Sequence, residues 1–315
     1  MNINRGLVVL STGSWYDVLL ADGQTLKCRL RGKFRMHGIK TTNPVVVGDK
    51  VEFIFQENDN IGLITAIDNR KNYIIRKSTR LSKISHIIAA NVDKAFLVVT
   101  IKQPRTSLGF VDRFLTAAEA YRIPVELIFN KIDLLDKNDL LELNKVIALY
   151  QNVGYLCHQT SVVENVGIDL LKVRLHGNIS LFAGHSGAGK SALLNMVNPS
   201  LNIRVGEISD YHNKGKHTTT FAQMHALGEN TFLVDSPGIK EFGLINYEKY
   251  EVSHFFLEMR PFMNQCKYHN CTHLHEPQCA VKEAVESGSI ALSRYNNYVG
   301  ILTGEDMDIE SWKLE

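Results

Sequence analysis

A glycine-rich run that ends in a lysine and a serine is the clearest chemical signal in this sequence. It follows an apolar stretch at residues 179–182 and reads Gly184-His185-Ser186-Gly187-Ala188-Gly189-Lys190-Ser191-Ala192. Such glycines let the backbone turn tightly, and a following helix favours negative charge at its N-terminus. The spacing predicts a phosphate-binding loop, with Lys190 on the outer phosphates and the Ser191 hydroxyl on magnesium. The alternative is a glycine-rich turn before a surface helix.

A second motif, Asn130-Lys131-Ile132-Asp133, follows a predicted buried strand at residues 124–129. The Asp133 carboxylate can accept hydrogen bonds from guanine N1 and N2, whereas adenine presents a different donor pattern. Taken alone, these four residues could form an ordinary turn between a strand and a helix. Together with a phosphate loop, they predict GTP as the ligand. Thr160 and Ser161 follow a predicted short strand at residues 154–157, and we expect them to supply a backbone amide to the base oxygen.

Two further segments predict the parts of the site that respond to the terminal phosphate. Asp235-Ser236-Pro237-Gly238 follows a predicted strand at residues 231–234, which places Asp235 near magnesium and the Gly238 amide near that phosphate. Of the threonines at positions 218–220, we expect Thr219 to bind magnesium. A plain hairpin turn is the alternative for residues 235–238. Ordinary guanine-nucleotide switches have the phosphate loop first, so this sequence predicts the same site assembled in a rotated order.

The residue after Gly238 is Ile239, where many efficient GTPases have a glutamine that orients the attacking water. Isoleucine cannot do this, so we expect slow hydrolysis until a partner supplies order or charge. His217, beside the threonines, is the candidate catalytic residue, and His212 is its weaker substitute. The alternative is that His217 is an exposed loop residue.

A cluster of metal-ligand residues follows these segments, with the spacing C-x4-C-x-H-x5-C. Its members are Cys266, Cys271, His273 and Cys279. Three thiolates and one imidazole match the ligands that zinc prefers, and nothing in the pattern leaves an open position for chemistry. We therefore expect one structural Zn²⁺, with His269 and His275 as alternative ligands. A reduced cysteine cluster without metal is the other interpretation.

Composition favours an enzyme of several domains in a reducing compartment. The chain has 315 residues, of which 44% are hydrophobic, and no apolar stretch approaches the length of a membrane span. The apolar run at residues 7–10 is too short for the core of a signal peptide. Cys28 and Cys157 are isolated, which does not suggest a disulfide framework. We expect a cytoplasmic protein that is a monomer.

Charge is distributed unevenly along the chain. Residues 1–90 contain 14 Lys or Arg and 7 Asp or Glu, which gives a charge of +7 there and −5 in the remainder. Within this part, basic residues alternate with other residues at Lys27, Arg29, Arg31, Lys33 and Arg35. A strand would display them on one face, where they would attract the phosphodiester backbone of RNA. A solvated sheet face is the alternative.

Short strands are predicted at residues 6–10, 16–20, 25–30, 45–55 and 61–66. Five such strands favour an oligonucleotide-binding barrel (OB-fold), although periodicity does not exclude other small barrels. Alternating strands and helices follow at residues 95–101, 111–121, 125–129 and 139–150, as in a parallel sheet covered by helices. Residues 280–287 and 290–302 are predicted to be helical. Arg294, Tyr295 and Tyr298 in the second of these helices could contact RNA, although packing is the expected role.

The motifs together resemble the ribosome small-subunit-dependent GTPase A family, also called RsgA or YjeQ. The resemblance covers nearly the whole chain and rests on residues 130–133, 184–191, 215–220 and 235–238 and on the cysteine and histidine cluster. It implies an N-terminal all-β OB-fold barrel, a circularly permuted α/β P-loop GTPase domain and a zinc-binding, mostly helical C-terminal domain. We place the barrel at residues 1–70, a linker at 71–92, the GTPase domain at 93–246 and the zinc-binding domain at 247–315.

The resemblance also implies a late role in assembly of the bacterial 30S ribosomal subunit, with 16S rRNA as the partner rather than DNA or a membrane. Binding to the subunit would stimulate slow GTP hydrolysis. Because the chain leaves the nucleotide core after Gly238, we expect hydrolysis to reorient the barrel and the C-terminal domain and to release the protein. The alternatives are an RNA-binding adaptor that keeps nucleotide as a structural ligand and an ATP-using enzyme that acts on nucleic acid.

Overall fold

The protein is described by a computed structural model that covers residues 3–31, 44–56, 59–76, 86–203, 223–235 and 247–304. The chain divides into two compact units. The first contains Met1–Ala95, Asp169–Ala183 and Leu194–Phe242, and the second contains Phe96–Ile168, Gly184–Leu193 and Gly243–Glu315. The chain therefore passes between the units several times. Among the described residues, no helix combines the length and the apolar character needed to cross a bilayer.

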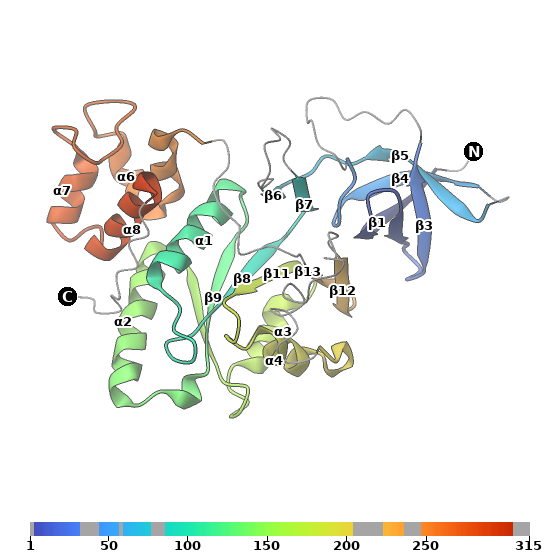
Figure 1. Ribbon diagram of the computed structural model, residues 1–315, viewed down its shortest axis with the longest axis horizontal. Coiled ribbons are helices and arrows are strands. Elements are labelled where there is room, and N and C mark those ends of the chain that lie inside the picture. The colour runs from blue at the N-terminus through green and yellow to red at the C-terminus, as the bar shows by residue number, and fades with distance from the viewer. Residues whose placement is uncertain are drawn as a thin grey trace. The chain divides into compact units, whose positions relative to one another are not determined.

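The first unit begins with a closed five-stranded barrel (Figure 1). Its strands are β1 (Ile3–Ser11), β2 (Tyr16–Leu19), β3 (Thr25–Leu30), β4 (Lys50–Gln56) and β5 (Ile61–Ile67). They pair in the order β1-β2-β3-β5-β4, and β4 closes the barrel on β1. The β3–β5 pair is parallel, whereas the other pairs are antiparallel. This arrangement confirms the predicted OB-fold barrel.

Side chains of β3 alternate between the barrel interior and its surface. Cys28 is fully buried, whereas Lys27 and Arg29 are exposed, as is Arg31 just beyond the strand. The basic face predicted from the sequence is therefore present at these three positions. Lys33 and Arg35 lie outside the described residues.

The predicted strand at residues 45–55 is wrong in its first half, because β4 begins at Lys50. Residues 45–49 form a turn in which the Asp49 amide donates to the Val46 carbonyl. Gly48 has a φ of 90°, and a Cβ at this position would lie 2.0 Å from the Ala90 carbonyl oxygen. An apolar run of valines thus resembled a strand although a turn interrupts it.

The residues predicted to form a linker contain two paired strands, β6 (Tyr73–Arg76) and β7 (His86–Ala90). They begin after a buried ion pair between Arg70 and Asp49, with 2.7 Å between Nη2 and Oδ2. The side chains of Arg70 and Asp49 are 6% and 0% exposed, so this ion pair fixes the chain as it leaves the barrel.

The remaining elements of the first unit include three strands that belong to the nucleotide-binding region by sequence. They are β11 (Ile179–Gly184), β12 (Gln223–Gly228) and β13 (Thr231–Asp235). Strand β13 pairs in parallel with β11 and antiparallel with β12. Three helical elements accompany them: α3 (Ile168–Leu175), the second half of α4 (Lys190–Val197) and the 3-10 helix η2 (Pro199–Leu201). The first half of α4, as far as Leu193, belongs to the second unit.

The second unit contains a parallel α/β arrangement. Its strands and helices are β8 (Lys94–Val99), α1 (Leu108–Ala120), β9 (Val125–Asn130), η1 (Ile132–Leu134), α2 (Lys137–Val153) and β10 (Leu156–Thr160). All six residues of β9 are buried, which explains its apolar run at residues 127–129, and the buried Glu126 is paired with His158 at 2.7 Å. Strand β10 pairs in parallel with β9, from Leu156 opposite Glu126 to Thr160 opposite Asn130. The carboxyl ends of the two strands are therefore neighbours.

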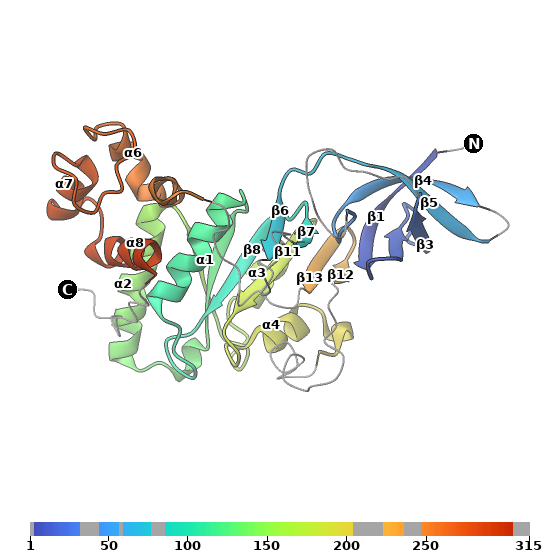
Figure 2. The same ribbon diagram turned by 45° about the horizontal axis from the view of Figure 1, so that its top comes forward.

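The C-terminal part of the second unit is helical and lies against α1 (Figure 1 and Figure 2). Its elements are η4 (Lys249–Phe255), η5 (Leu257–Met259), α6 (Arg260–Met263), α7 (Ala280–Glu286) and α8 (Leu292–Thr303). It has a core of its own, which includes Phe256, Met259, Tyr298 and two of the predicted metal ligands, Cys271 and Cys279.

A buried polar network joins α8 to α1 and α2. The Arg294 side chain is 1% exposed and donates to Asp112 on α1 and, at 2.6 and 3.0 Å, to the two oxygens of Glu258. Asp112 also accepts from the Tyr150 hydroxyl at 2.8 Å and from Asn297 Nδ2 at 2.6 Å. Arg294 therefore packs inside the protein, as expected, rather than contacting RNA.

Candidate functional site

The glycine-rich run forms a loop between β11 and the N-terminus of α4. A Cβ at Gly184, whose φ is 140°, would lie 2.4 Å from the Val98 carbonyl oxygen at the end of β8. The Lys190 ammonium donates to the carbonyls of Gly184 and His185 at 2.8 and 2.7 Å. The loop therefore closes around its own lysine at the carboxyl end of β8, where an anion would meet the N-terminus of α4.

Asn130 joins the two motifs that the sequence presents in rotated order. Its Nδ2 donates to the Ala188 carbonyl at 2.9 Å, across 58 residues of chain, and its Oδ1 accepts from the Thr160 hydroxyl at 2.9 Å. Gly189 must lack a side chain here, because a Cβ would lie 2.3 Å from Asn130 Nδ2. The structure thus brings residues 130–133 and the glycine-rich loop into direct contact.

Ser161 reaches the same site through its side chain. Its hydroxyl donates to Asp133 Oδ1 at 2.6 Å and accepts from the Glu164 amide at 3.0 Å. The Ser161 amide donates to the Val166 carbonyl at 3.1 Å, so it already has a partner within the chain. Thr160 and Ser161 thus contact Asn130 and Asp133 with their hydroxyls, and the expected contact of a backbone amide with the base stays a prediction.

The loop between β8 and α1 contributes residues that sequence reasoning missed. Lys131 donates from its ammonium to the Gln103 carbonyl, and a Cβ at Gly187 would lie 3.3 Å from Pro104 Cδ. The His185 ring stacks on Phe110 of α1, with ring centroids 4.1 Å apart. This loop could have been predicted from its position at the carboxyl end of a strand next to β9, because α/β proteins bind ligands at the carboxyl ends of their strands.

Several predicted residues lie outside the described part of the chain. These are Thr219, Gly238, His217 and its substitute His212. Asp235 ends β13, but its side chain is also outside that part. The described site therefore contains Asn130, Lys131, Ile132, Asp133, Thr160, Ser161 and residues 184–192.

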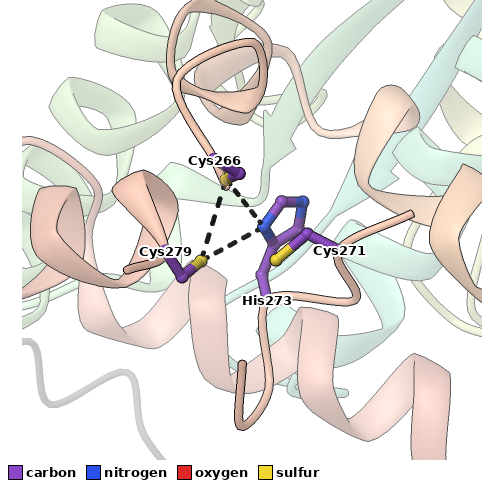
Figure 3. A group of neighbouring side chains, drawn as sticks. All are labelled: Cys266, Cys271, His273 and Cys279. Carbon is purple, nitrogen blue, oxygen red and sulfur yellow. Dashed lines mark hydrogen bonds between the residues drawn. The ribbon is translucent and has the colours of Figure 1, made fainter. Parts of the chain in front are cut away.

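Four side chains converge in the C-terminal region, as predicted (Figure 3). The ligand atoms of Cys266, Cys271, His273 and Cys279 all lie within 4.8 Å of one another. His273 Nδ1 is 3.6 Å from Cys266 Sγ and 3.3 Å from Cys279 Sγ, and the two sulfurs are 4.0 Å apart. Sulfur ligands placed tetrahedrally around one zinc ion lie about 3.8 Å apart, so this set fits a tetrahedral metal site.

The chemistry of these ligands is consistent with metal binding. All five cysteines of the chain are free. Burial lowers the pKa of His273 and so favours the neutral imidazole that binds metals, whereas burial raises the pKa of Cys271 to about 12. The buried thiols therefore need a cation nearby to lose their protons. His269 and His275 are exposed and do not belong to the cluster.

Glu276 organises the turn that carries His273. Its carboxylate accepts from the amides of Thr272 and Leu274 at 2.8 and 3.0 Å and from the Thr272 hydroxyl at 2.6 Å. Burial raises the pKa of Glu276, but these hydrogen bonds outweigh burial and lower it to about 2. His273 has a φ of 57°, a left-handed conformation that few residues adopt without support.

Comparisons with known proteins cover nearly the whole chain. Residues 5–64 match the RsgA N-terminal domain, and residues 67–245 match the RsgA GTPase. The small ribosomal subunit biogenesis GTPase RsgA 2 of Bacteroides thetaiotaomicron is 49% identical over 302 residues, which are 96% of this chain and 97% of that protein. The RsgA of Christiangramia forsetii is 46% identical over 304 residues, 96% of each chain.

Two solved structures are also similar over the full length. YjeQ from Thermotoga maritima has a TM-score of 0.79 and 36% identity, covering 96% of this chain and 99% of that chain. YloQ, described as a circularly permuted GTPase, has a TM-score of 0.74 and 28% identity, covering 96% of this chain and 95% of that chain.

Proposed function

Because the chain belongs to the RsgA family of GTPases, we propose that it hydrolyses GTP as an assembly factor of the small ribosomal subunit. The observation that carries this proposal is the contact of Asn130 with both Ala188 and Thr160. It joins a base-reading motif to a phosphate loop in one site.

In this proposal, the nucleotide lies across the loops that Asn130 connects. Asp133, oriented by Ser161, accepts from guanine N1 and N2, and residues 184–192 surround the phosphates. The donor to the base oxygen is the amide of Val162, since the Ser161 amide is bonded to Val166. Lys190 turns from the carbonyls it now contacts to the outer phosphates.

The residues predicted to respond to the terminal phosphate complete the site. Ser191, Thr219 and Asp235 hold a Mg²⁺ ion, which offsets the charge of the phosphates when it is bound with the nucleotide. Ser191 suits this role because it begins α4 beside Lys190 and offers a hydroxyl oxygen, the kind of ligand Mg²⁺ prefers. The Gly238 amide contacts the terminal phosphate, and His217 is the candidate catalytic residue near the attacking water.

The metal in the cysteine cluster is proposed to be one structural Zn²⁺. The donor set of three sulfurs and one imidazole, together with the short distances between them, supports zinc over harder ions. Cys271 and Cys279 belong to the hydrophobic core of the C-terminal region, so the metal would tie that core together.

The barrel is proposed to contact RNA through β3 and the connection between β1 and β2. The Arg29 guanidinium lies over the Trp15 ring, 3.6 Å from its centroid, and Lys27 and Arg31 are exposed beside it. OB-folds bind oligonucleotides with this strand and this connection. The cations would hold phosphates while the Trp15–Arg29 pair stacks on a base.

The proposed partners are the 30S subunit and its 16S rRNA, and the proposed place of action is the cytoplasm, where the protein acts as a monomer. We further propose the division into a barrel at residues 1–70, a linker at 71–92, a GTPase domain at 93–246 and a zinc-binding domain at 247–315. The Arg294 network ties the last of these to α1. We therefore propose that hydrolysis reorients the C-terminal region together with α1.

The proposal is tested by the rate of GTP hydrolysis with purified small subunits, with large subunits and with neither. We expect stimulation by small subunits only. If the protein bound GTP but small subunits left its rate of GTP hydrolysis unchanged, it would instead be an adaptor that keeps nucleotide as a structural ligand.

Base recognition has a separate test in Asp133→Asn. An amide in place of the carboxylate matches xanthine rather than guanine, so the variant should exchange GTP for xanthosine triphosphate in binding and hydrolysis. Lys137→Ala, at the start of α2 and outside the site, is the control. Unchanged preference for GTP in the Asp133 variant would show that another residue reads the base.

A further inference from the structure

The second unit has a pocket of about 710 Å³ that contains neither the nucleotide loops nor the metal ligands. It lies between the last turn of α1, the turn that leads into β9, and residues 247–260. The side chains that matter for its chemistry are those of Glu119, Arg122, Tyr247, His254, Phe255 and Arg260. Its volume is in the range of sites that enclose small ligands.

This pocket is separate from the nucleotide site. Ile123 and Pro124 line it and immediately precede β9, whose opposite end carries Asn130. A strand of six residues spans about 20 Å, so the two sites lie at opposite ends of the same strand.

Two arginines give the pocket a positive character. Arg260 is held from two sides, with Nε donating to the His254 carbonyl at 2.7 Å and Nη2 donating to Glu119 at 2.9 Å. These bonds use two of the five guanidinium N–H groups, and the side chain is 46% exposed. Arg122 is exposed and sits in a left-handed turn that its own amide closes onto the Glu119 carbonyl at 3.0 Å. The one carboxylate of the lining is therefore already paired.

An aromatic wall stands beside these cations. The rings of Tyr247 and Phe255 meet edge to face, with centroids 4.8 Å apart. The Tyr247 hydroxyl donates to the Ala120 carbonyl at 3.1 Å, which fixes this ring to the end of α1. A fixed aromatic wall next to a guanidinium is the arrangement that stacks a nucleobase while its phosphate is held.

We propose that this pocket binds one unpaired nucleotide of RNA, with its base against Tyr247 and Phe255 and its phosphate on Arg122 and Arg260. The proposal rests on the proposed function, because the small subunit supplies the RNA. An acidic peptide would use the two guanidinium groups and leave the aromatic wall without a purpose. RNA seated here contacts α1 and the C-terminal region together.

A fluorescent reporter tests the pocket apart from the barrel. The chain has two tryptophans, so replacing Trp15 and Trp312 with Phe and introducing Phe255→Trp leaves one tryptophan, in the pocket. The probe is a single-stranded RNA of ten nucleotides that contains all four bases. We expect RNA to quench this fluorescence and Arg122→Glu to weaken the apparent affinity at least tenfold. Arg122→Glu should also reduce the slope of log K against log salt by about one.

Lys249→Glu is the matched control, because Lys249 is an exposed cation of the same region that does not line the pocket. Equal effects of the two charge reversals, or no quenching in the parent reporter, would overturn the proposal. The proposal would also be overturned if Arg122→Glu weakened binding to small subunits but left the quenching by RNA unchanged. A ribosomal protein would then be the ligand. If small subunits did not stimulate GTP hydrolysis by the unmodified protein, the proposed function would be refuted instead.

Discussion

The two ligand-binding regions of the second unit are built in opposite ways. In the nucleotide region, Asn130 at the end of the buried strand β9 contacts Ala188 in the glycine-rich loop, across 58 residues of chain. In the metal region, the outermost ligands Cys266 and Cys279 are 13 residues apart and lie in turns. Long-range closure is stabilised by the sheet, whereas the short turn is stabilised by local contacts with Glu276 and with the core of the C-terminal region.

The difference predicts where each region obtains its stability. Because β9 is buried along its whole length, we expect the strands to position the nucleotide loops without help from GTP. The metal-binding turn includes His273 in a left-handed conformation, and two of its cysteines belong to the local core. We therefore expect the metal region, and not the nucleotide loops, to depend on its ligand for folding.

Removal of the metal should have the largest effect. Structural zinc contributes about 10–16 kcal/mol in small domains at neutral pH, so a strong chelator under reducing conditions should unfold residues 266–279 and the core around them. GTP binding should persist, because the contacts of Asn130 do not involve this region. Metal content, near-UV circular dichroism and GTP affinity measure the three parts of this prediction.

Cys271→Ser should reproduce the effect of the chelator, whereas Cys157→Ser, outside the cluster, should not. Simultaneous loss of GTP binding and of the metal region would show that the two regions fold as one, contrary to the comparison.

The junction between the regions should be the next most sensitive position. Arg294→Met leaves the fully buried carboxyl of Asp112 without its cation, which costs about 3–5 kcal/mol in the free energy of unfolding. Urea denaturation of the metal-loaded protein measures this change. Arg113→Ala, at the exposed neighbour of Asp112, should change stability by less than about 1 kcal/mol. A similar small change for Arg294→Met would mean that water reaches the network.

The sequence predicted that the four residues of the metal region meet, whereas it did not predict the side-chain contacts within the nucleotide region. The spacing of Cys266, Cys271, His273 and Cys279 is short enough that few arrangements bring them together, and the structure has the cluster as predicted. The barrel strands were also predictable, since Cys28 and its neighbours alternate between interior and surface. A run of valines at 45–47 misled the prediction, because apolar character alone does not reveal the turn at Gly48.

The side-chain roles at the nucleotide site could not be predicted in the same way. Thr160 and Ser161 were predicted to follow a strand at residues 154–157, whereas β10 runs from Leu156 to Thr160. Only the register of β10 against β9 shows that their hydroxyls face Asn130 and Asp133. The contact of Lys131 with Gln103 joins segments 28 residues apart through the fold, and no local pattern encodes it.

On the nucleotide side, Asn130→Ala should have an intermediate effect. It removes two buried hydrogen bonds and leaves the Thr160 hydroxyl and the Ala188 carbonyl without this partner, at a cost of about 2 kcal/mol. GTP affinity should fall at least tenfold while metal content stays unchanged. Thr160→Val, which removes one of the two bonds, should cost about half as much. Equal GTP affinity in all three proteins would show that the sheet alone positions the loops.

Glu276→Gln should have the smallest effect and should be confined to the metal region. The substitution keeps an acceptor oxygen but removes the charge that strengthens the bonds from Thr272 and Leu274. Residues that orient metal ligands are worth about 10-fold or more in metal affinity, so metal should transfer to a competing chelator about tenfold faster. Glu283→Gln, an exposed carboxylate on α7, is the control. If both variants release metal at the rate of the unmodified protein, the metal itself holds the left-handed turn at His273. The metal region then depends on its ligand even more strongly than its hydrogen bonds indicate.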